Sequence, residues 1–114
     1  MGRAKFEIEY LEEAISFLRS LDGKVAAKIM YNVSKSKYAL DKELFKKLGN
    51  TDIWEFRTLY NGIAYRLFAF WDVDKKALVV ATHGFVKKTQ KTPRKELDKA
   101  IAIRKQYYEN KKGK

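Results

Sequence analysis

Arg57 and Arg66 are the residues whose spacing first suggests chemistry, because they stand at matching positions on either side of Asn61-Gly62. The flanking runs are rich in aromatic and β-branched residues, and Asn-Gly supplies the two positive-φ residues of a type I′ turn, so a β-hairpin is predicted. With Asn61 and Gly62 in the turn, Arg57 lies directly opposite Arg66. Like charges in a cross-strand pair are destabilising. We therefore expect this pair to act on an anion.

The charge of the chain points to an acidic partner. The formal net charge is +11, and residues 87–114 carry 11 basic and 3 acidic side chains, a net charge of +8. Such a segment predicts contact with nucleic acid, a ribosome or an acidic protein, although a solvated basic surface has the same composition. The chain has no cysteine and a single histidine, His83, which excludes disulfides, thiolate catalysis and metal sites rich in cysteine or histidine. No acidic cluster has the spacing of a metal site, so no metal or cofactor is expected.

The length and composition indicate a single cytosolic domain. The 114 residues suffice for one modest core, and the hydrophobic content of 46% can fill it. There is no apolar run of membrane-spanning length and no signal-peptide pattern. We expect one domain over residues 1–109, followed by a disordered basic tail, Asn110–Lys114.

The first part of the chain predicts a strand and two helices. Apolar and charged residues alternate over residues 3–10, which indicates a half-buried strand. From Leu11 the apolar residues recur at helical spacing, and Asp22-Gly23 ends this helix. A second amphipathic helix begins near Lys24, so that the two form a helical hairpin.

The middle of the chain predicts a loop and a three-stranded meander. The periodicity fades over residues 34–50, which we interpret as a helix end and a connecting loop with one short helical turn at Glu43–Leu48. The hairpin strands are predicted at Asp52–Leu59 and Ala64–Trp71, and a polar turn leads to a third strand at Ala77–Phe85.

The two faces of the hairpin differ in character. One face mixes charge with aromatic residues, and Phe68 and Phe70 are expected to be exposed there beside the arginines. The turn before the third strand is too long to set its register, so the face of His83 stays open. The other face is almost wholly apolar and is expected to pack against the two helices; its residues are Trp54, Phe56, Tyr65, Leu67, Ala69 and Trp71.

A basic loop and a last helix complete the chain. The loop Lys87–Pro93 contains no acidic residue. Thr92 followed by Pro93 is typical of an N-cap and first helical residue, and the helix is predicted to run to about Glu109.

Three sequence motifs resemble those of a known family. The runs W-E-F-R, Y-R-L-F and H-G-F-V-K-K-T-Q-K-T-P, followed by a basic helix, resemble the phage-derived HigB-like branch of the RelE superfamily, the toxins of type II toxin–antitoxin modules. The resemblance covers about Thr51 to Tyr108 and implies an α+β fold, in which an N-terminal strand and a helical hairpin pack on an antiparallel sheet, with a C-terminal helix. It also implies a metal-independent endoribonuclease that cuts mRNA on the ribosome by 2′-OH attack on the scissile phosphate. The implied partners are mRNA, the ribosome and a cognate antitoxin of the helix-turn-helix class.

The resemblance assigns roles to individual residues. Arg66 matches the family's strand arginine and is expected at the scissile phosphate, unless it serves only as a structural partner of Glu55. Glu55 stands where some relatives have lysine and could act as a base; we prefer that it orients the arginines. His83 and Tyr107–Tyr108 could transfer protons, or could be structural. The expected catalytic residues are Arg66, Arg57, His83 and Lys88, and the expected RNA-binding residues are Lys87, Thr89, Gln90, Lys91 and Arg94.

Two other functions remain compatible with the sequence. The same superfamily includes toxins that inhibit gyrase, and a non-catalytic nucleic-acid-binding module would need only the basic loop and helix. A gyrase supercoiling assay separates the first alternative, and loss of function on replacing Arg66 argues against the second.

Overall fold

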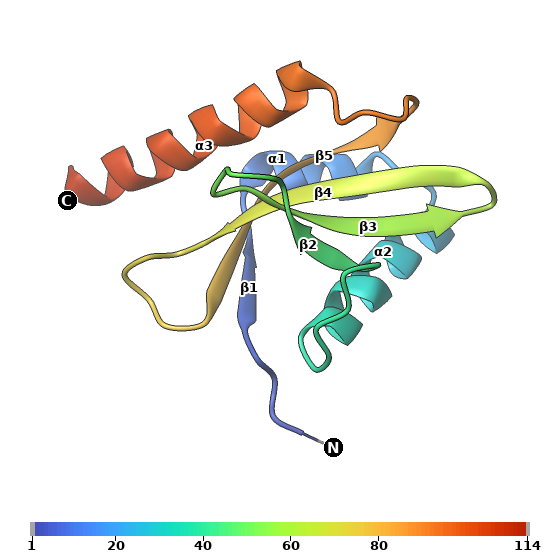
Figure 1. Cartoon of the computed structure of the whole chain (residues 1–114), viewed down its shortest axis with the longest axis horizontal. Helices are drawn as coiled ribbons and strands as arrows, with labels where there is room; N and C mark the ends of the chain where they lie inside the picture. Colours follow the sequence, from blue (N-terminus) through green and yellow to red (C-terminus); the bar gives the residue numbers. More distant parts are fainter. Residues whose placement is uncertain (1, 114) are drawn as a thin grey trace.

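The sheet at the centre of the molecule carries helices on both faces. In a computed structural model describing residues 2–113, the elements in chain order are β1 (Glu7–Tyr10), α1 (Glu12–Arg19), α2 (Gly23–Ser36), β2 (Phe45–Lys47), β3 (Trp54–Tyr60), β4 (Ile63–Trp71), β5 (Leu78–Lys87) and α3 (Arg94–Lys112). The strand order is β1-β5-β4-β3-β2, with α1 and α2 packed on one face and α3 on the other (Figure 1). This arrangement confirms the predicted α+β fold.

The β3–β4 hairpin has the predicted register. Asn61 and Gly62 occupy the turn with φ of 51° and 77°, the left-handed values that a type I′ turn requires. Every cross-strand pair follows that register, and Arg57 lies opposite Arg66. A purely local turn signal thus placed the two arginines correctly.

Two short edge strands widen the predicted meander to five strands. β1 pairs in parallel with β5, and β2 pairs antiparallel with β3. The strand β2 corrects the prediction of a loop with a helical turn at Glu43–Leu48. Three residues are too few to show a period of two; the strand is held by the buried ring of Phe45, which stacks on Phe56 with centroids 4.2 Å apart. The pairing also sets Lys46 opposite Glu55.

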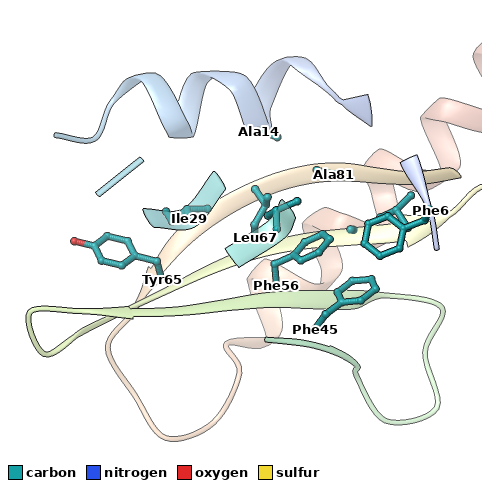
Figure 2. Packing of buried hydrophobic residues seen from close by; sticks show 11 residues of the cluster. Phe6, Ala14, Ile29, Phe45, Phe56, Tyr65, Leu67 and Ala81 are labelled. Atoms are coloured by element: carbon teal, nitrogen blue, oxygen red, sulfur yellow. The ribbon is translucent and has the colours of Figure 1, made fainter. Parts of the chain in front are cut away.

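The larger core lies between the sheet and the α1–α2 hairpin, as the apolar face predicted. Phe45 and Phe56 meet Phe6, which precedes β1, and Figure 2 shows these three rings at one end of the cluster with Tyr65 toward the other. Burial of a large aromatic side chain contributes roughly 1.5–3 kcal/mol. Ala14 of α1 and Ile29 and Val33 of α2 belong to the same buried cluster, so the helical hairpin packs on this face and the other face is left to α3.

Gly84 is a point of close approach between β5 and α1. A Cβ atom at this position would lie 2.1 Å from Cδ2 of Phe17. We therefore expect Gly84→Ala to lower the free energy of unfolding by about 1–3 kcal/mol, the usual range for overpacking. Urea denaturation measures the change. In a Phe17→Ala background the penalty should largely disappear, and a full penalty there would rule out this contact as the cause.

A second core lies between the sheet and α3. Phe68 and Phe70 are both 0% exposed and pack against Leu97 and Ala100 of α3. The expectation that these two phenylalanines are exposed beside the arginines is therefore wrong. The hairpin alone leaves that face open, and only the return of α3 over it buries the two rings.

The first turn of α3 differs slightly from the prediction. Pro93 occupies the N-cap position that was expected for Thr92, and the helix begins at Arg94. Because proline has a fixed φ and no N–H group, either position suits it at a helix start. No helix among residues 2–113 combines the length and apolar character needed to cross a membrane.

The end of α3 also departs from the prediction. The helix continues to Lys112, so the expected disordered tail Asn110–Lys114 is helical over its first three residues, while Lys114 lies outside the described residues. A contact distant in sequence explains the extension, because Lys111 Nζ lies 2.5 Å from Oδ2 of Asp72.

The Asp72 carboxylate anchors the end of α3. Its Oδ2 accepts hydrogen bonds from the Tyr107 hydroxyl and from Lys111 Nζ, each at 2.5 Å, and its Oδ1 accepts from the backbone N–H groups of Asp74 and Lys75 at 2.7 and 2.8 Å. Burial alone would raise the pKa of Asp72, but the hydrogen bonds outweigh it and hold the pKa well below its ordinary value.

The lowered pKa of Asp72 predicts a dependence of stability on pH. The folded state binds the Asp72 proton less readily than the unfolded state, so the contribution is complete above about pH 4 and is lost as the pH falls further. Asp72→Asn should be less stable than the wild type at neutral pH, and the gap should narrow in acid. Urea denaturation of both proteins at neutral pH and in acid tests this prediction. An equal difference in the free energy of unfolding under the two conditions would show that the carboxylate charge is not the cause.

Candidate active site

The two arginines lie on a part of the sheet that α3 leaves uncovered. The turn end of the β3–β4 hairpin runs on past the N-terminal end of α3 (Figure 1). In this region Arg66 lies between Arg57 on β3 and Phe85 on β5, and Ala64 lies beside Lys87. Because side chains alternate between the two faces of a sheet, these residues share the face that α3 packs against farther along.

A concave surface opens at this point, which we call the basic hollow. It has a volume of about 420 Å³, and its wall carries four cationic side chains and no carboxylate, so its chemistry suits a phosphate group. The hollow is lined by Arg57, Ala64, Arg66, Lys87, Lys88, Thr89 and Gln90.

The buried carboxylate of Glu55 forms ion pairs with both arginines. Its carboxylate is 2% exposed, with Oε1 3.3 Å from Arg66 Nε and Oε2 3.7 Å from Arg57 Nε. These contacts are ion pairs without aligned hydrogen bonds, since Glu55 Oε1 and both Nε atoms are buried with no hydrogen-bond partner. The pairing between Arg66 and Glu55 therefore exists, and Arg66 lines the hollow as well, so its structural and anion-binding roles are compatible.

The four cationic side chains of the basic hollow outnumber the single carboxylate, that of Glu55, which contacts two of them. Burial lowers the pKa of Arg66, Glu55 opposes this, and the neighbouring Arg57 lowers the pKa further. Burial also lowers the pKa of Lys87, and Arg66, Arg57 and Lys46 add to the effect while Glu55 opposes it. An anion entering the hollow would relieve this repulsion, which favours binding of a phosphate.

His83 lies outside the basic hollow. Opposite Phe68 on the face covered by α3, it is 2% exposed, with Nε2 3.0 Å from Glu96 Oε1 and Nδ1 3.1 Å from Thr82 Oγ1. Burial lowers the pKa of His83, and the hydrogen bond to Glu96 opposes that effect. The structure thus gives this predicted catalytic residue two partners within the protein and does not bring it to the arginines.

Two predicted RNA-binding residues also lie outside the hollow. Arg94 is exposed at the start of α3 and pairs with Asp98, Nε to Oδ1, at 3.0 Å. Lys91 is exposed in the loop, and its carbonyl accepts a hydrogen bond from the Thr89 hydroxyl at 2.8 Å. They can meet only a long ligand that extends beyond the hollow.

Tyr107 and Tyr108 hold α3 in place. The Tyr107 hydroxyl bonds to Asp72, and the Tyr108 hydroxyl accepts from the backbone N–H of Val73 at 2.9 Å. Both rings also pack against Phe70. This corresponds to the structural alternative for the two tyrosines.

An adjoining concave surface, which we call the α2 hollow, was not predicted from the sequence. Its volume is about 430 Å³, and it shares Arg57, Ala64 and Arg66 with the basic hollow. The available signal was the spacing of Lys28 and Lys35, since residues seven apart lie on one face of a helix. The other residues that line it are Asn32, Glu43, Leu44, Thr58 and Leu59.

Lys46 is the other residue that sequence reasoning missed. It contributes to the electrostatic environment of Lys87 through its place on β2. Without the strand β2, nothing in the sequence connects it to the arginines. Among residues 2–113, no three side chains of histidine, cysteine, aspartate or glutamate come together as a metal site would require.

Comparison with known proteins places this geometry in a structural context. The family model described as phage-derived protein Gp49-like matches residues 16–105. A mutant of the toxin RelE from Escherichia coli, in the free state, is similar with a TM-score of 0.60 and 18% identity, covering 87% of this chain and 96% of that chain. The RelBE2 toxin–antitoxin complex from Mycobacterium tuberculosis is similar with a TM-score of 0.56 and 18% identity, covering 74% and 93%. The intact Escherichia coli RelBE complex gives a TM-score of 0.55 and 15% identity, covering 74% and 99%. No curated protein sequence matches significantly.

Proposed function

Because this chain belongs to the phage-derived Gp49-like family and has the fold of the RelE toxins, we propose that it is the toxin of a type II toxin–antitoxin module. Its proposed activity is that of an mRNA endoribonuclease that acts on the ribosome and so inhibits translation. Its place in the HigB-like branch stays a prediction from the sequence motifs.

The observation that carries this proposal is the convergence of Arg57, Arg66 and Lys87 on one hollow without a carboxylate on its wall. Planar guanidinium groups suit the paired oxygens of a phosphate. The buried Glu55 keeps both arginines in position before a ligand arrives, and such preorganisation is the usual source of electrostatic catalysis.

The proposed reaction is an internal phosphoryl transfer. The ribose 2′-OH attacks the adjacent phosphorus, so that an O2′–P bond forms and the P–O5′ bond breaks, leaving a 2′,3′-cyclic phosphate. The 2′-OH loses one proton to solvent water, and O5′ gains one. Arg66 and Arg57 stabilise the charge on the non-bridging oxygens, with Lys88 at the rim, while Lys87, whose pKa is lowered, releases a proton to O5′ more readily than an ordinary lysine.

The proposed partner is an antitoxin of the helix-turn-helix class. Two of the similar structures are toxin–antitoxin complexes, which supports an antitoxin as the partner, while its helix-turn-helix class stays a prediction from the sequence. Phe68 and Phe70 are buried and therefore do not form part of a surface for this partner. The net charge of +11 still favours an acidic partner surface.

Induction of the protein without a neighbouring gene tests the proposal. Growth and translation should stop, and primer extension on translated messages should reveal new 5′ ends within coding regions. An Arg66→Ala variant at equal protein level provides the control. Intact messages during growth arrest would contradict the proposal, and a gyrase supercoiling assay would then examine the same-fold alternative.

The lowered pKa of Lys87 predicts an early loss of RNA affinity in alkali. As the pH rises, Lys87 should lose its charge before an ordinary lysine does, so affinity for an uncleavable RNA should begin to fall at a lower pH than unperturbed lysines would give. Lys87→Arg keeps the charge and should shift this fall to higher pH. Fluorescence anisotropy across the pH range measures both proteins, and identical profiles would assign the titration to another group.

A further inference from the structure

The α2 hollow continues the basic hollow around the free edge of the hairpin. Arg57, Ala64 and Arg66 line both hollows. β2 pairs with β3 up to Phe56, and the Arg57 N–H still donates to the Leu44 carbonyl at 2.8 Å, so the edge of β3 is free of strand pairing from Thr58 on. An extended ligand that leaves the basic hollow can therefore pass over this edge of β3 into the α2 hollow.

Lys28 and Lys35 stand along the far side of the α2 hollow. They are two turns apart on α2, about 10 Å by the rise of a helix. Among residues 2–113 neither forms an ion pair, although Lys28 lies 5.2 Å from the centre of the Tyr31 ring. One acidic residue, Glu43, also lines the hollow, so the wall remains positive when Arg57 and Arg66 are included.

The lining of the α2 hollow also includes apolar and uncharged polar residues. Leu59 lines the hollow and is 70% exposed, so it leaves a large apolar surface open there. Asn32 lies deeper and donates a hydrogen bond from Nδ2 to Thr58 Oγ1 at 3.0 Å, which fixes its amide. A lining that combines cations with an exposed apolar side chain suits the alternation of phosphate with sugar and base in a single strand.

We infer that the α2 hollow is a second phosphate subsite for single-stranded RNA, in which Lys28 and Lys35 hold the strand as it leaves the arginine pair over the edge of β3. The inference rests on the proposed function, because it takes the basic hollow to be the site of the scissile phosphate. The inferred path of the RNA runs along α2, whereas the charge distribution of the sequence predicts RNA contact with the C-terminal segment. Continuity with the arginines favours RNA over an acidic peptide.

The test compares oligonucleotides of different length. Uncleavable 2′-O-methyl RNAs with one phosphate and with several phosphates are titrated by fluorescence anisotropy over a range of salt. The test variant is Lys28→Ala/Lys35→Ala, and the control is Lys75→Ala/Lys76→Ala, which removes two exposed lysines from the β4–β5 turn at the other end of the hairpin. Circular dichroism confirms that both variants are folded.

For the longer RNA, the test variant should have a salt slope shallower than the control by about 1.4 units, at about 0.7 per phosphate for a single strand. For the RNA with one phosphate, the two variants should bind equally. Equal slopes with the longer RNA would overturn the inference.

The outcome can be separated from that of the proposed function. Uncleavable RNA reports binding only, so a wild type that binds along α2 but never cuts RNA would refute the endoribonuclease and leave this path standing. A wild type that cuts RNA, together with a test variant that binds as the control does, would refute the path and leave the endoribonuclease standing.

Discussion

Replacement of Arg66 by alanine is expected to lower the rate of RNA cleavage by about 10²–10³-fold, the effect of removing one preorganised donor to a developing oxyanion. Arg57→Ala should lower the rate less, because Arg57 is more exposed and its Nε lies farther from Glu55. Single-turnover cleavage of a defined mRNA measures both. Normal cleavage by a folded Arg66→Ala protein would show that the assignment of the scissile phosphate is wrong.

The same substitution has an expected effect on stability that the structure reverses. Opposed arginines alone predict that removing Arg66 stabilises the fold slightly. The structure places a buried Glu55 carboxylate 3.3 Å from Arg66 Nε, so removing Arg66 leaves that carboxylate with only the more distant Arg57. We therefore expect Arg66→Ala to destabilise the protein by about 1–3 kcal/mol.

A matched pair of variants separates the catalytic effect from the stability effect. Glu55→Gln/Arg66→Ala removes both charges of the pair and should recover much of the lost stability while cleavage stays impaired. Urea denaturation of the single and double variants gives the coupling between the two residues. If recovered stability restores cleavage too, Arg66 acted only through the fold.

Removal of the loop lysines is expected to weaken RNA binding and its salt dependence. The sequence predicts that replacing Lys87, Lys88 and Lys91 together flattens the slope of log K against log salt by roughly two units. Because Lys91 does not line the basic hollow, the structure assigns most of that change to Lys87 and Lys88, about 1.4 units.

Alanine variants in steps measure this division. The Lys87→Ala/Lys88→Ala protein should have nearly the slope of the triple variant, and Lys91→Ala alone should resemble the wild type. The Lys75→Ala/Lys76→Ala protein again controls for a general loss of charge. A triple variant with the wild-type slope would place the electrostatic contacts elsewhere on the surface.

Local chemistry allowed the sequence to predict the hairpin and the position of its arginines. Asn61-Gly62 imposes its own backbone conformation, and that conformation sets the register of both strands. The amphipathic helices and the basic loop were predicted for the same reason, since each pattern depends on residues near one another in the chain. Six of the predicted site residues consequently meet in the basic hollow.

The face of His83 depended on a feature without a sequence signal. The β4–β5 turn contains Ala77 with φ of 56°, a conformation that usually calls for glycine or asparagine. The ladder also shifts register between Phe68 and Ala69. Neither of these two features could be predicted from residue types, so the sequence left the face of His83 open. The structure places His83 under α3.

Contacts between distant segments decided the rest of the site. Phe68 and Phe70 are buried because α3 packs over them. The strand β2 forms because Phe45 stacks on Phe56. Lys28 and Lys35 approach the arginines only when α2 packs across the sheet. The sequence by itself determined which cations stand on the hairpin, through short-range backbone preferences. Which surfaces stay open around those cations depends on the packing of elements far apart in the chain, and only the tertiary structure decided it.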